Sequence, residues 1–369
     1  MRVAILGTRG FPKIQGGVEK HCEGLAVNLV KLGCVVIVFT RKPYVNINIK
    51  EYRGVKLVAL PTVRKKTLEA FLHTFIGIFI ALKYRPDILH IQSIGPALFT
   101  PLARILGMKV VVTSHGSNYK HLKWDWFAKF VLKVGERLGT YFANEIICIS
   151  KVIADDIKSN YNKKPHIIPN GVKIPKILKF EDVLNKYSLT KGKYILTVGR
   201  FVPEKGFGDL IDAFYRVDLG DWKLVIVGRA DHESEYSRDL KNKSKENRNI
   251  VLTGFLSGIL LEELYSHAGL FVLPSYYEGL PIALLEAMSY GLLCFASDIP
   301  ANRCIALPDE NYFPAGNVDQ LSDKLRNFIK MTFSKDQKSR QIEILRQKYD
   351  WDDIAKKTMD VYMKVACGS

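Results

Sequence analysis

Cysteine is scarce in this chain of 369 residues, and its arrangement gives no sign of crosslinks or zinc binding. The six cysteines form no CxxC pair and have no closely spaced histidine. Several lie in apolar runs, as Cys148 does in Ile146-Ile147-Cys148-Ile149. We therefore expect buried, reduced thiols in a cytoplasmic protein rather than a disulfide framework or a zinc site.

Long hydrophobic runs are also missing. The longest, residues 70–82, contains His73 and is too short to span a bilayer. The apolar residues at the N-terminus lead straight into Gly7 and a glycine-rich loop, which is typical of a strand and not of a signal peptide. We therefore do not expect a transmembrane protein.

Acidic residues are few in the first half of the chain. Residues 1–180 carry 29 Lys and Arg against 10 Asp and Glu, whereas residues 181–369 carry 25 against 27. Such asymmetry indicates an anionic partner for the first half: nucleic acid, acidic lipid or a phosphorylated substrate. Solubility alone is the alternative. No nucleic-acid-binding motif is present, so we do not expect nucleic acid.

Short β-branched runs alternate with helical patterns along the whole chain, which predicts βα units around parallel sheets. The pattern pauses in a looser stretch with prolines after Pro169-Asn170-Gly171-Val172 and then restarts. We expect an α/β protein with two Rossmann-like, doubly wound domains, residues 1–175 and 176–350. A last helix, 351–369, has no assigned packing partner. Such sheets bind ligands beyond the carboxyl ends of their strands, so a cleft between the domains is the default active site.

Two features of the first half lie at expected strand ends. Residues 7–18 hold four glycines and two cations before a helix, a pattern that suits either a phosphate-binding loop or a plain tight turn. It is not the dinucleotide fingerprint, because the spacing is not GxGxxG and the second strand ends in Thr40-Arg41-Lys42 instead of an acid. His115, in Ser114-His115-Gly116, follows another strand and is expected to face the cleft unless it only satisfies a turn.

The second half has a similar loop, which carries Arg200 and Lys205 after a strand. Two cations whose sole acidic neighbour in sequence is Glu204 suit a diphosphate. The alternative is a solvated loop in which Glu204 pairs with Lys205.

The most specific motif contains two glutamates, Glu278 and Glu286. Glu278 is expected in the turn after a strand, and Gly279 and Pro281 set up a helix with proline at its first position. Glu286 lies within that helix among apolar neighbours, so its carboxylate needs a hydroxyl or cationic partner. The helix N–H groups can take a phosphate while the carboxylates take sugar hydroxyls.

In order along the chain, the motifs are Gly16-Gly17, Ser114-His115-Gly116, Ile149-Ser150-Lys151, Pro169-Asn170-Gly171-Val172, Val198-Gly199-Arg200 with Lys205-Gly206, and the glutamate pair. This ordered set resembles the retaining glycosyltransferases with the GT-B fold. More narrowly, it resembles the family 4 enzymes of bacterial polysaccharide, lipopolysaccharide and capsule synthesis. The resemblance implies transfer of a sugar from a nucleotide-diphosphate-sugar donor, with retained stereochemistry through same-face attack assisted by the leaving phosphate.

The resemblance also implies roles for individual residues. The donor diphosphate is bound by Arg200 and Lys205, together with Gly16-Gly17 and the backbone at Gly279 and Leu280. Glu286 holds the ribose, Glu278 contacts the transferred sugar, and His115 contacts its hydroxyls. One departure, Arg229-Ala230 where relatives often have a small or acidic residue and a second glycine, leaves the contacts to the base uncertain.

No metal cofactor is expected. The single Asp-x-Asp triplet, Asp350-Trp351-Asp352, stands directly before the last helix, where an aspartate is an ordinary N-cap. Cations and helix N-termini can stabilise a departing diphosphate without a metal.

The basic half suggests the acceptor. Arg64-Lys65-Lys66 precede three phenylalanines, and residues 119–130 mix Lys with Trp and Phe, as in segments that lie on an anionic membrane. A core helix is the alternative for the first stretch. We expect a peripheral enzyme at the inner face of the plasma membrane that adds a sugar to a polyprenyl-diphosphate-linked glycan. Competing interpretations are a sugar-nucleotide epimerase, a phosphorylase and a non-catalytic sugar-nucleotide-binding subunit.

Overall fold

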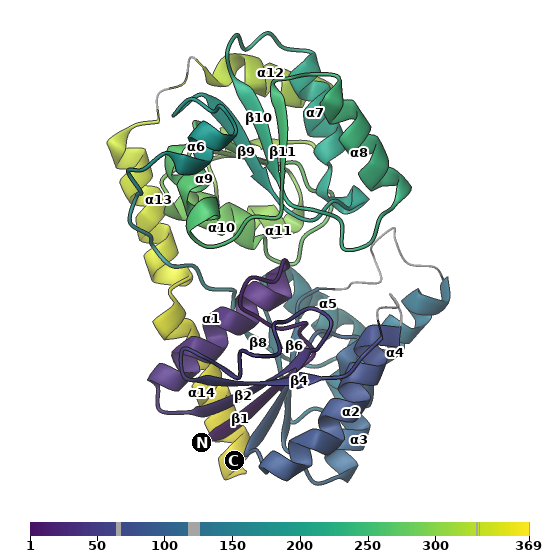
Figure 1. Ribbon diagram of the computed structural model, residues 1–369. Coiled ribbons are helices and arrows are strands. Elements are labelled where there is room, and N and C mark those ends of the chain that lie inside the picture. The colour runs from purple at the N-terminus through teal and green to yellow at the C-terminus, as the bar shows by residue number, and fades with distance from the viewer. Residues whose placement is uncertain (64–67, 117–125, 330, 332, 369) are drawn as a thin grey trace. The chain divides into compact units, whose positions relative to one another are not determined.

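The computed structural model describes residues 1–63, 68–116, 126–329, 331 and 333–368. The chain forms two compact units (Figure 1). The first comprises Met1–Gly171 together with Tyr349–Ser369, and the second comprises Val172–Lys348. The domain boundary expected at residue 175 lies at Gly171 in the structure, and the last helix, for which the sequence indicates no packing partner, belongs to the first unit.

The first unit is built on an eight-stranded sheet in the order β3-β4-β2-β1-β5-β6-β7-β8. All neighbours are parallel except β3 and β4. The strands are β1 (Arg2–Leu6), β2 (Val35–Arg41), β3 (Glu51–Tyr52), β4 (Val55–Leu60), β5 (Ile88–Gln92), β6 (Val110–Ser114), β7 (Glu145–Cys148) and β8 (His166–Ile167). The central strands are apolar on both faces because helices cover both sides.

Alternate residues of β1 enter two different cores. Val3 and Ile5 pack with α1 (Gly17–Lys31) and α14 (Trp351–Cys367), and Ala4 and Leu6 pack with α2 (Leu68–Tyr84). The remaining elements are η1 (Pro96–Phe99), α3 (Thr100–Ile105), α4 (Trp126–Phe142) and α5 (Lys151–Tyr161).

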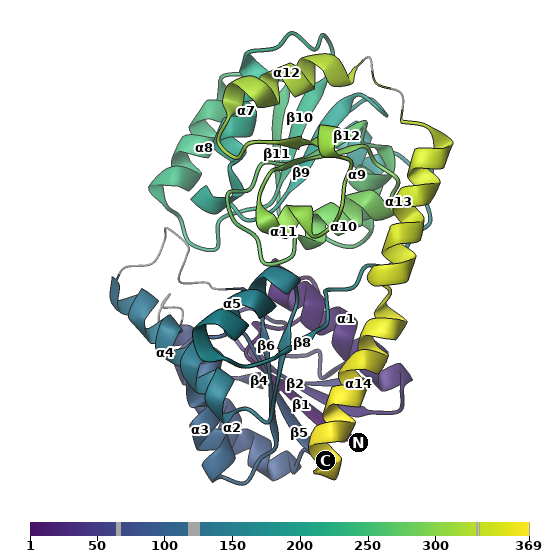
Figure 2. The same cartoon turned by 180° about the vertical axis from the view of Figure 1, so that it is seen from behind.

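The C-terminal helix α14 is an integral part of the first unit and lies along α1 (Figure 2). Its Tyr362 is fully buried. Its first residue, Trp351, fits between two glycines: a Cβ on Gly24 would lie 2.2 Å from the indole, and one on Gly171 would lie 2.4 Å from it. Asp350 caps the helix, as expected, by accepting hydrogen bonds from the amides of Asp352 and Asp353.

The second unit has a six-stranded parallel sheet in the order β11-β10-β9-β12-β13-β14. Its strands are β9 (Tyr194–Val198), β10 (Lys223–Val227), β11 (Ile250–Gly254), β12 (Leu270–Leu273), β13 (Cys294–Ser297) and β14 (Tyr312–Phe313). Its helices are α6 (Asp182–Lys186), η3 (Pro203–Lys205), α7 (Phe207–Tyr215), α8 (Glu235–Lys245), α9 (Ile259–His267), α10 (Ile282–Ser289), α11 (Pro300–Arg303), η4 (Asp309–Asn311), α12 (Val318–Phe328) and α13 (Lys335–Lys348).

Each sheet has a topological switch point, where the chain changes the direction in which it adds strands. In the first unit β1 lies between β2 and β5, and in the second β9 lies between β10 and β12. Loops that leave the carboxyl ends of these strands diverge and form a crevice suited to ligands. The sequence-predicted site residues follow β1, β6, β9 and β12, so they lie at or next to these two points.

Candidate functional site

Lys205 and Glu278 form an ion pair at the switch point of the second unit. Lys205 Nζ lies 2.5 Å from Glu278 Oε1, and the two side chains are 19% and 10% exposed. Ser275 Oγ donates to the same carboxylate oxygen at 2.7 Å. The alternative of a solvated Glu204–Lys205 pair is therefore wrong, because the partner of Lys205 comes from a loop 73 residues away.

Gly206 holds the two loops in contact. It has φ +63, and a Cβ at this position would lie 2.2 Å from the carbonyl oxygen of Pro274. The amide of Tyr276 also donates to the carbonyl of Glu204 at 2.9 Å. Only glycine combines this backbone conformation with so close an approach, so Gly206 fixes the position of Lys205 relative to Glu278.

Arg200 also has an acidic partner that the sequence analysis did not anticipate. Its Nη1 lies 3.2 Å from Asp231 Oδ2, in the loop after β10, and its side chain is 31% exposed. The amide of Phe201 donates to the carbonyl of Arg229, which ties the same two loops together. The expectation that Arg200 and Lys205 have Glu204 as their sole acidic neighbour is thus corrected.

Glu286 faces a buried hydroxyl. Tyr265 Oη lies 3.4 Å from Glu286 Oε2, and the Tyr265 ring stacks on Tyr290 with centroids 5.3 Å apart. Burial, followed by the charge of Glu286, raises the pKa of Tyr265 well above its ordinary value, so its hydroxyl keeps a proton that it shares between Glu286 and the carbonyl of Ala283, which is also 3.4 Å away. The Tyr265 hydroxyl is the kind of partner that a carboxylate within a helix needs. Tyr265 is far from Glu286 in sequence, so the sequence did not indicate this contact.

The α10 helix begins one residue later than expected. Pro281 is its N-cap rather than its first helical residue, and the helix runs from Ile282 to Ser289. Gly279 and Leu280 connect Glu278 to this helix start, and Leu280 is buried. Glu278 therefore precedes the N-terminus of α10, and Glu286 lies within the helix, after its first turn.

The glycine-rich loop of the first unit is stabilised from within. Arg9 is buried and pairs with Glu19 of α1 at 3.1 Å, and it also donates to the carbonyl of Gln15. Burial opposes ionisation of Glu19, but the charge and hydrogen bonds of Arg9 hold its pKa below the ordinary value. One of the two loop cations therefore orders the loop and is not free for a phosphate.

The same ion pair explains why Gly16 is glycine. Gly16 has φ +146, and a Cβ there would lie 2.0 Å from Glu19 Oε2. Gly17 is the first residue of α1, and no side chain in the described part of the chain caps this helix. The backbone at Gly16-Gly17 can accordingly approach a ligand.

His115 follows β6 and is partly exposed. Its Nε2 lies 2.7 Å from Oε1 of Gln92, the last residue of β5, and its ring meets that of His21 edge-on at 4.9 Å. Burial, together with His21 and His90, lowers the pKa of His115 well below its ordinary value. The ring is neutral at physiological pH. Sequence analysis identified His115 but missed Gln92.

Within the described residues, no group of three or more His, Cys, Asp or Glu side chains is placed to hold a metal ion. The basic residues 64–66 and the stretch 119–125, on which the membrane prediction was based, lie outside the described residues. The structure describes the helices that follow them, α2 and α4.

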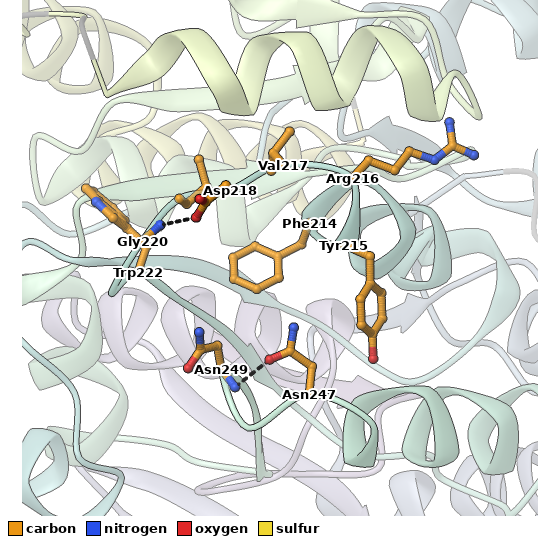
Figure 3. A pocket seen from close by; sticks show the side chains of 10 residues that line it. Phe214, Tyr215, Arg216, Val217, Asp218, Gly220, Trp222, Asn247 and Asn249 are labelled. Carbon is orange, nitrogen blue, oxygen red and sulfur yellow. Dashed lines mark hydrogen bonds between the residues drawn. The ribbon is translucent and has the colours of Figure 1, made fainter.

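A hollow of about 350 Å³ lies elsewhere in the second unit, lined by the end of α7 and the residues that precede β10 and β11 (Figure 3). Phe214, Trp222 and Asn249 are among its lining residues. It lies at the amino ends of the strands, whereas α/β sheets bind ligands beyond their carboxyl ends, and it contains none of the predicted site residues.

The two halves of the chain match two family models. Residues 15–174 match "Glycosyltransferase Family 4" and residues 180–347 match "Glycosyl transferases group 1". An uncharacterised glycosyltransferase of Methanocaldococcus jannaschii is 29% identical over 98% of both chains. The UDP-Gal:alpha-D-GlcNAc-diphosphoundecaprenol alpha-1,3-galactosyltransferase of Escherichia coli is 28% identical over 68% of both.

Among solved structures, Anabaena HepE in complex with UDP-glucose superposes with a TM-score of 0.81 at 16% identity, covering 99% of this chain and 100% of the other. This likeness concerns the fold and confirms the prediction of a GT-B protein with two parallel-sheet domains. The chain therefore belongs to the GT-B glycosyltransferases, with a family 4 N-terminal half and a group 1 C-terminal half.

Proposed function

We propose that the protein is a retaining, metal-independent glycosyltransferase that uses a nucleotide-diphosphate-sugar, with UDP as the first candidate nucleotide. The observation that carries this proposal is the pairing of Lys205 with Glu278 at the switch point of the second unit, just before the helix that carries Glu286. It places an ammonium group for a diphosphate against a carboxylate for sugar hydroxyls. The UDP-galactose named for the E. coli relative and the UDP-glucose bound to HepE support the choice of UDP.

In this proposal Arg200 and Lys205 stabilise the negative charge that develops on the departing diphosphate. Charged and dipolar groups fixed before the reaction are commonly the largest contribution to catalysis, and they make a metal unnecessary. The backbone at Gly279, Leu280 and Gly16-Gly17 adds N–H donors. The new glycosidic bond forms on the face that the diphosphate leaves, and a diphosphate oxygen takes the acceptor proton.

The carboxylates and His115 bind the neutral parts of the donor. Glu286, oriented by Tyr265, accepts from the ribose hydroxyls. Glu278 contacts the transferred sugar, and Ser275 and Lys205 hold its carboxylate in place. His115 contacts hydroxyls of the same sugar.

A thermal-shift screen against UDP-, GDP-, TDP- and ADP-sugars tests the donor class, because a ligand that binds the native state raises the melting temperature. Lys205→Met should lower kcat/KM by about 10²- to 10³-fold. Lys241→Met is the matched control, since Lys241 forms an exposed pair with Glu233 in the same unit. Equal activity of both variants would contradict the site assignment.

Two further measurements test the chemistry. NMR of the product should show the anomeric configuration of the donor, and a chelator should leave the rate unchanged. Donor isomerised in the absence of acceptor would favour an epimerase. A protein that binds donor tightly but transfers nothing to any lipid-linked glycan would favour the non-catalytic subunit.

We propose a polyprenyl-diphosphate-linked glycan as the acceptor, since the E. coli relative is named for a diphosphoundecaprenol substrate. The first unit supplies a surface for such a lipid: α2 exposes Phe71 and Phe75, and α4 exposes Trp126, Phe127 and Phe130. Both helices contact η1.

The charges on this surface suit an anionic membrane. Glu69 of α2 pairs with Arg41, and Glu136 of α4 is buried against Tyr161, so the acids turn inward. Lys133 and Arg137 are exposed on α4. Aromatic and basic side chains together favour peripheral binding at the cytoplasmic face. No described helix is both long enough and apolar enough to pass through a bilayer.

Flotation with vesicles tests the membrane proposal. Recovery should be greater with phosphatidylglycerol-containing vesicles than with neutral ones, and it should fall in the triple serine variant of Trp126, Phe127 and Phe130. A double serine variant of Ile259 and Leu260, which are exposed in the second unit, is the control. Equal recovery from acidic and neutral vesicles would remove the proposal.

A further inference from the structure

A buried polar network lies behind His115 at the switch point of the first unit. Gln92 is fully buried; its Oε1 faces His115, and its Nε2 lies 3.2 Å and 3.3 Å from the two ring nitrogens of His90. His90 is itself fixed by two hydroxyls, with Nδ1 2.6 Å from Tyr362 Oη and Nε2 2.7 Å from Thr113 Oγ1. The Gln92 amide thus lies between two imidazoles, with its Oε1 toward His115 and its Nε2 toward His90.

The backbone leaves Gln92 little freedom to move. It ends β5 in register with Thr113 of β6. A Cβ on Gly7, just after β1, would lie 2.3 Å from the backbone carbonyl oxygen of Gln92. The backbone at Gly7 therefore approaches the backbone of Gln92 as closely as a glycine permits. Because Gln92 is held in place, it can determine which tautomer His115 adopts.

The chemistry of the contact fixes that state. A glutamine carbonyl oxygen only accepts hydrogen bonds, so the ring nitrogen 2.7 Å away must carry the proton. Because His115 is neutral, its other nitrogen then carries none. The partner of one ring nitrogen determines what the other can do.

We propose that Gln92 is a positioning residue that holds His115 as the Nε2–H tautomer, so that Nδ1 is a hydrogen-bond acceptor for a hydroxyl of the transferred sugar. The site then selects sugars that have a hydroxyl at the contacted position over the matching deoxy sugar. A buried acceptor without its donor is costly, so this discrimination is strong. The selection rests on the proposed function, whereas the tautomer does not.

NMR of the full chain labelled with ¹⁵N-histidine tests the tautomer without any substrate. Long-range ¹H–¹⁵N spectra should show His115 with a protonated Nε2 and a bare Nδ1 in the wild type. In Gln92→Met the ring proton should exchange with solvent at least tenfold faster. A wild-type His115 protonated on Nδ1, or on both nitrogens at neutral pH, would overturn the proposal.

Kinetics with UDP-galactose and its monodeoxy analogues test the consequence. Gln92→Met should lower kcat/KM by about tenfold, the loss expected for one hydrogen bond of about 1.4 kcal/mol, and it should reduce the discrimination against one deoxy analogue. In the His115→Ala background the same change should have no further effect. If Gln92→Met lowered kcat/KM by the same factor in the His115→Ala background as in the wild type, Gln92 would act structurally and not through His115. That result would overturn the proposal.

Thr100→Val is the matched control. It removes a different buried side-chain hydrogen bond of the first unit, the one to Ala97, and should leave both the His115 spectrum and kcat/KM unchanged. If none of the UDP-, GDP-, TDP- and ADP-sugars is transferred, the proposed function fails, and the NMR result still decides the tautomer.

Discussion

Replacement of Gly206 by alanine should disrupt the contact between the loops that carry Lys205 and Glu278. The left-handed conformation costs a residue with a Cβ about 1–2 kcal/mol. The new Cβ would also lie 2.2 Å from the Pro274 carbonyl oxygen, and relief of such crowding costs about 1–3 kcal/mol. The sum, about 2–5 kcal/mol, corresponds to a fall of roughly 4–20 °C in melting temperature for a unit of this size.

The control is two residues away. Gly208 lies in α7, and a Cβ added there would meet no atom within 4 Å, so Gly208→Ala should be neutral or stabilise by up to about 1 kcal/mol. Calorimetry and urea denaturation of the two variants measure the difference, and isothermal titration measures donor binding. Gly206→Ala should weaken donor binding because Lys205 moves, whereas Gly208→Ala should not. Equal melting temperatures for Gly206→Ala and the wild type would show that the two loops do not require a glycine at this position.

Tyr265→Phe should raise the donor KM by about two- to fivefold, because Glu286 loses a long hydrogen bond worth about 0.5–1 kcal/mol. The control is Tyr194→Phe, which removes a hydroxyl that bonds to a backbone carbonyl. This change should lower the stability of the second unit but leave KM unchanged. Trp351→Ala should destabilise the first unit by about 3 kcal/mol, and exposed Met363→Ala should change little. Burial lowers the pKa of His21 to about 4, so this ring stays neutral in the folded unit but gains a proton below pH 6.5 in the unfolded chain. The free energy of unfolding should therefore fall from pH 6.5 to pH 4 by about 1.4 kcal/mol per pH unit for this group, and urea denaturation of His21→Asn should show the slope reduced by that amount.

Much of the fold follows from local sequence. The apolar runs at residues 55–60, 88–92, 194–198 and 223–227 form β4, β5, β9 and β10, in agreement with the expected alternation of strands and helices. The turn residues and charges at the ends of such runs limit their length to that of a strand. The short strands β3, β8 and β14 were missed because two residues carry no periodicity.

The residues proposed for the site stand out in the sequence one by one, whereas their structural partners do not. Arg200, Lys205, Glu278 and Glu286 stood out as charges beside glycine or within apolar runs. Their partners did not, because Asp231 and Tyr265 look like ordinary loop and helix residues until the sheet order brings them close. Gln92 was missed for a similar reason: a polar residue at the end of an apolar strand is common, and its meaning comes from His115, 23 residues later.

The partner of the last helix was also beyond sequence reasoning. An amphipathic pattern tells that a helix has an apolar face but not which sheet covers it. The structural signal was present as two glycines, Gly24 and Gly171, whose missing side chains make room for the Trp351 indole.

The return of α14 to the first unit has a consequence for biosynthesis. Tyr362 and Val365 belong to the same core as Val3 and Leu25, yet the ribosome makes them after the whole second unit. Nascent chains usually fold from the N-terminus, domain by domain. Here the later unit can finish folding before the earlier one, and until then the nascent α1 keeps an apolar stripe that chaperones can bind.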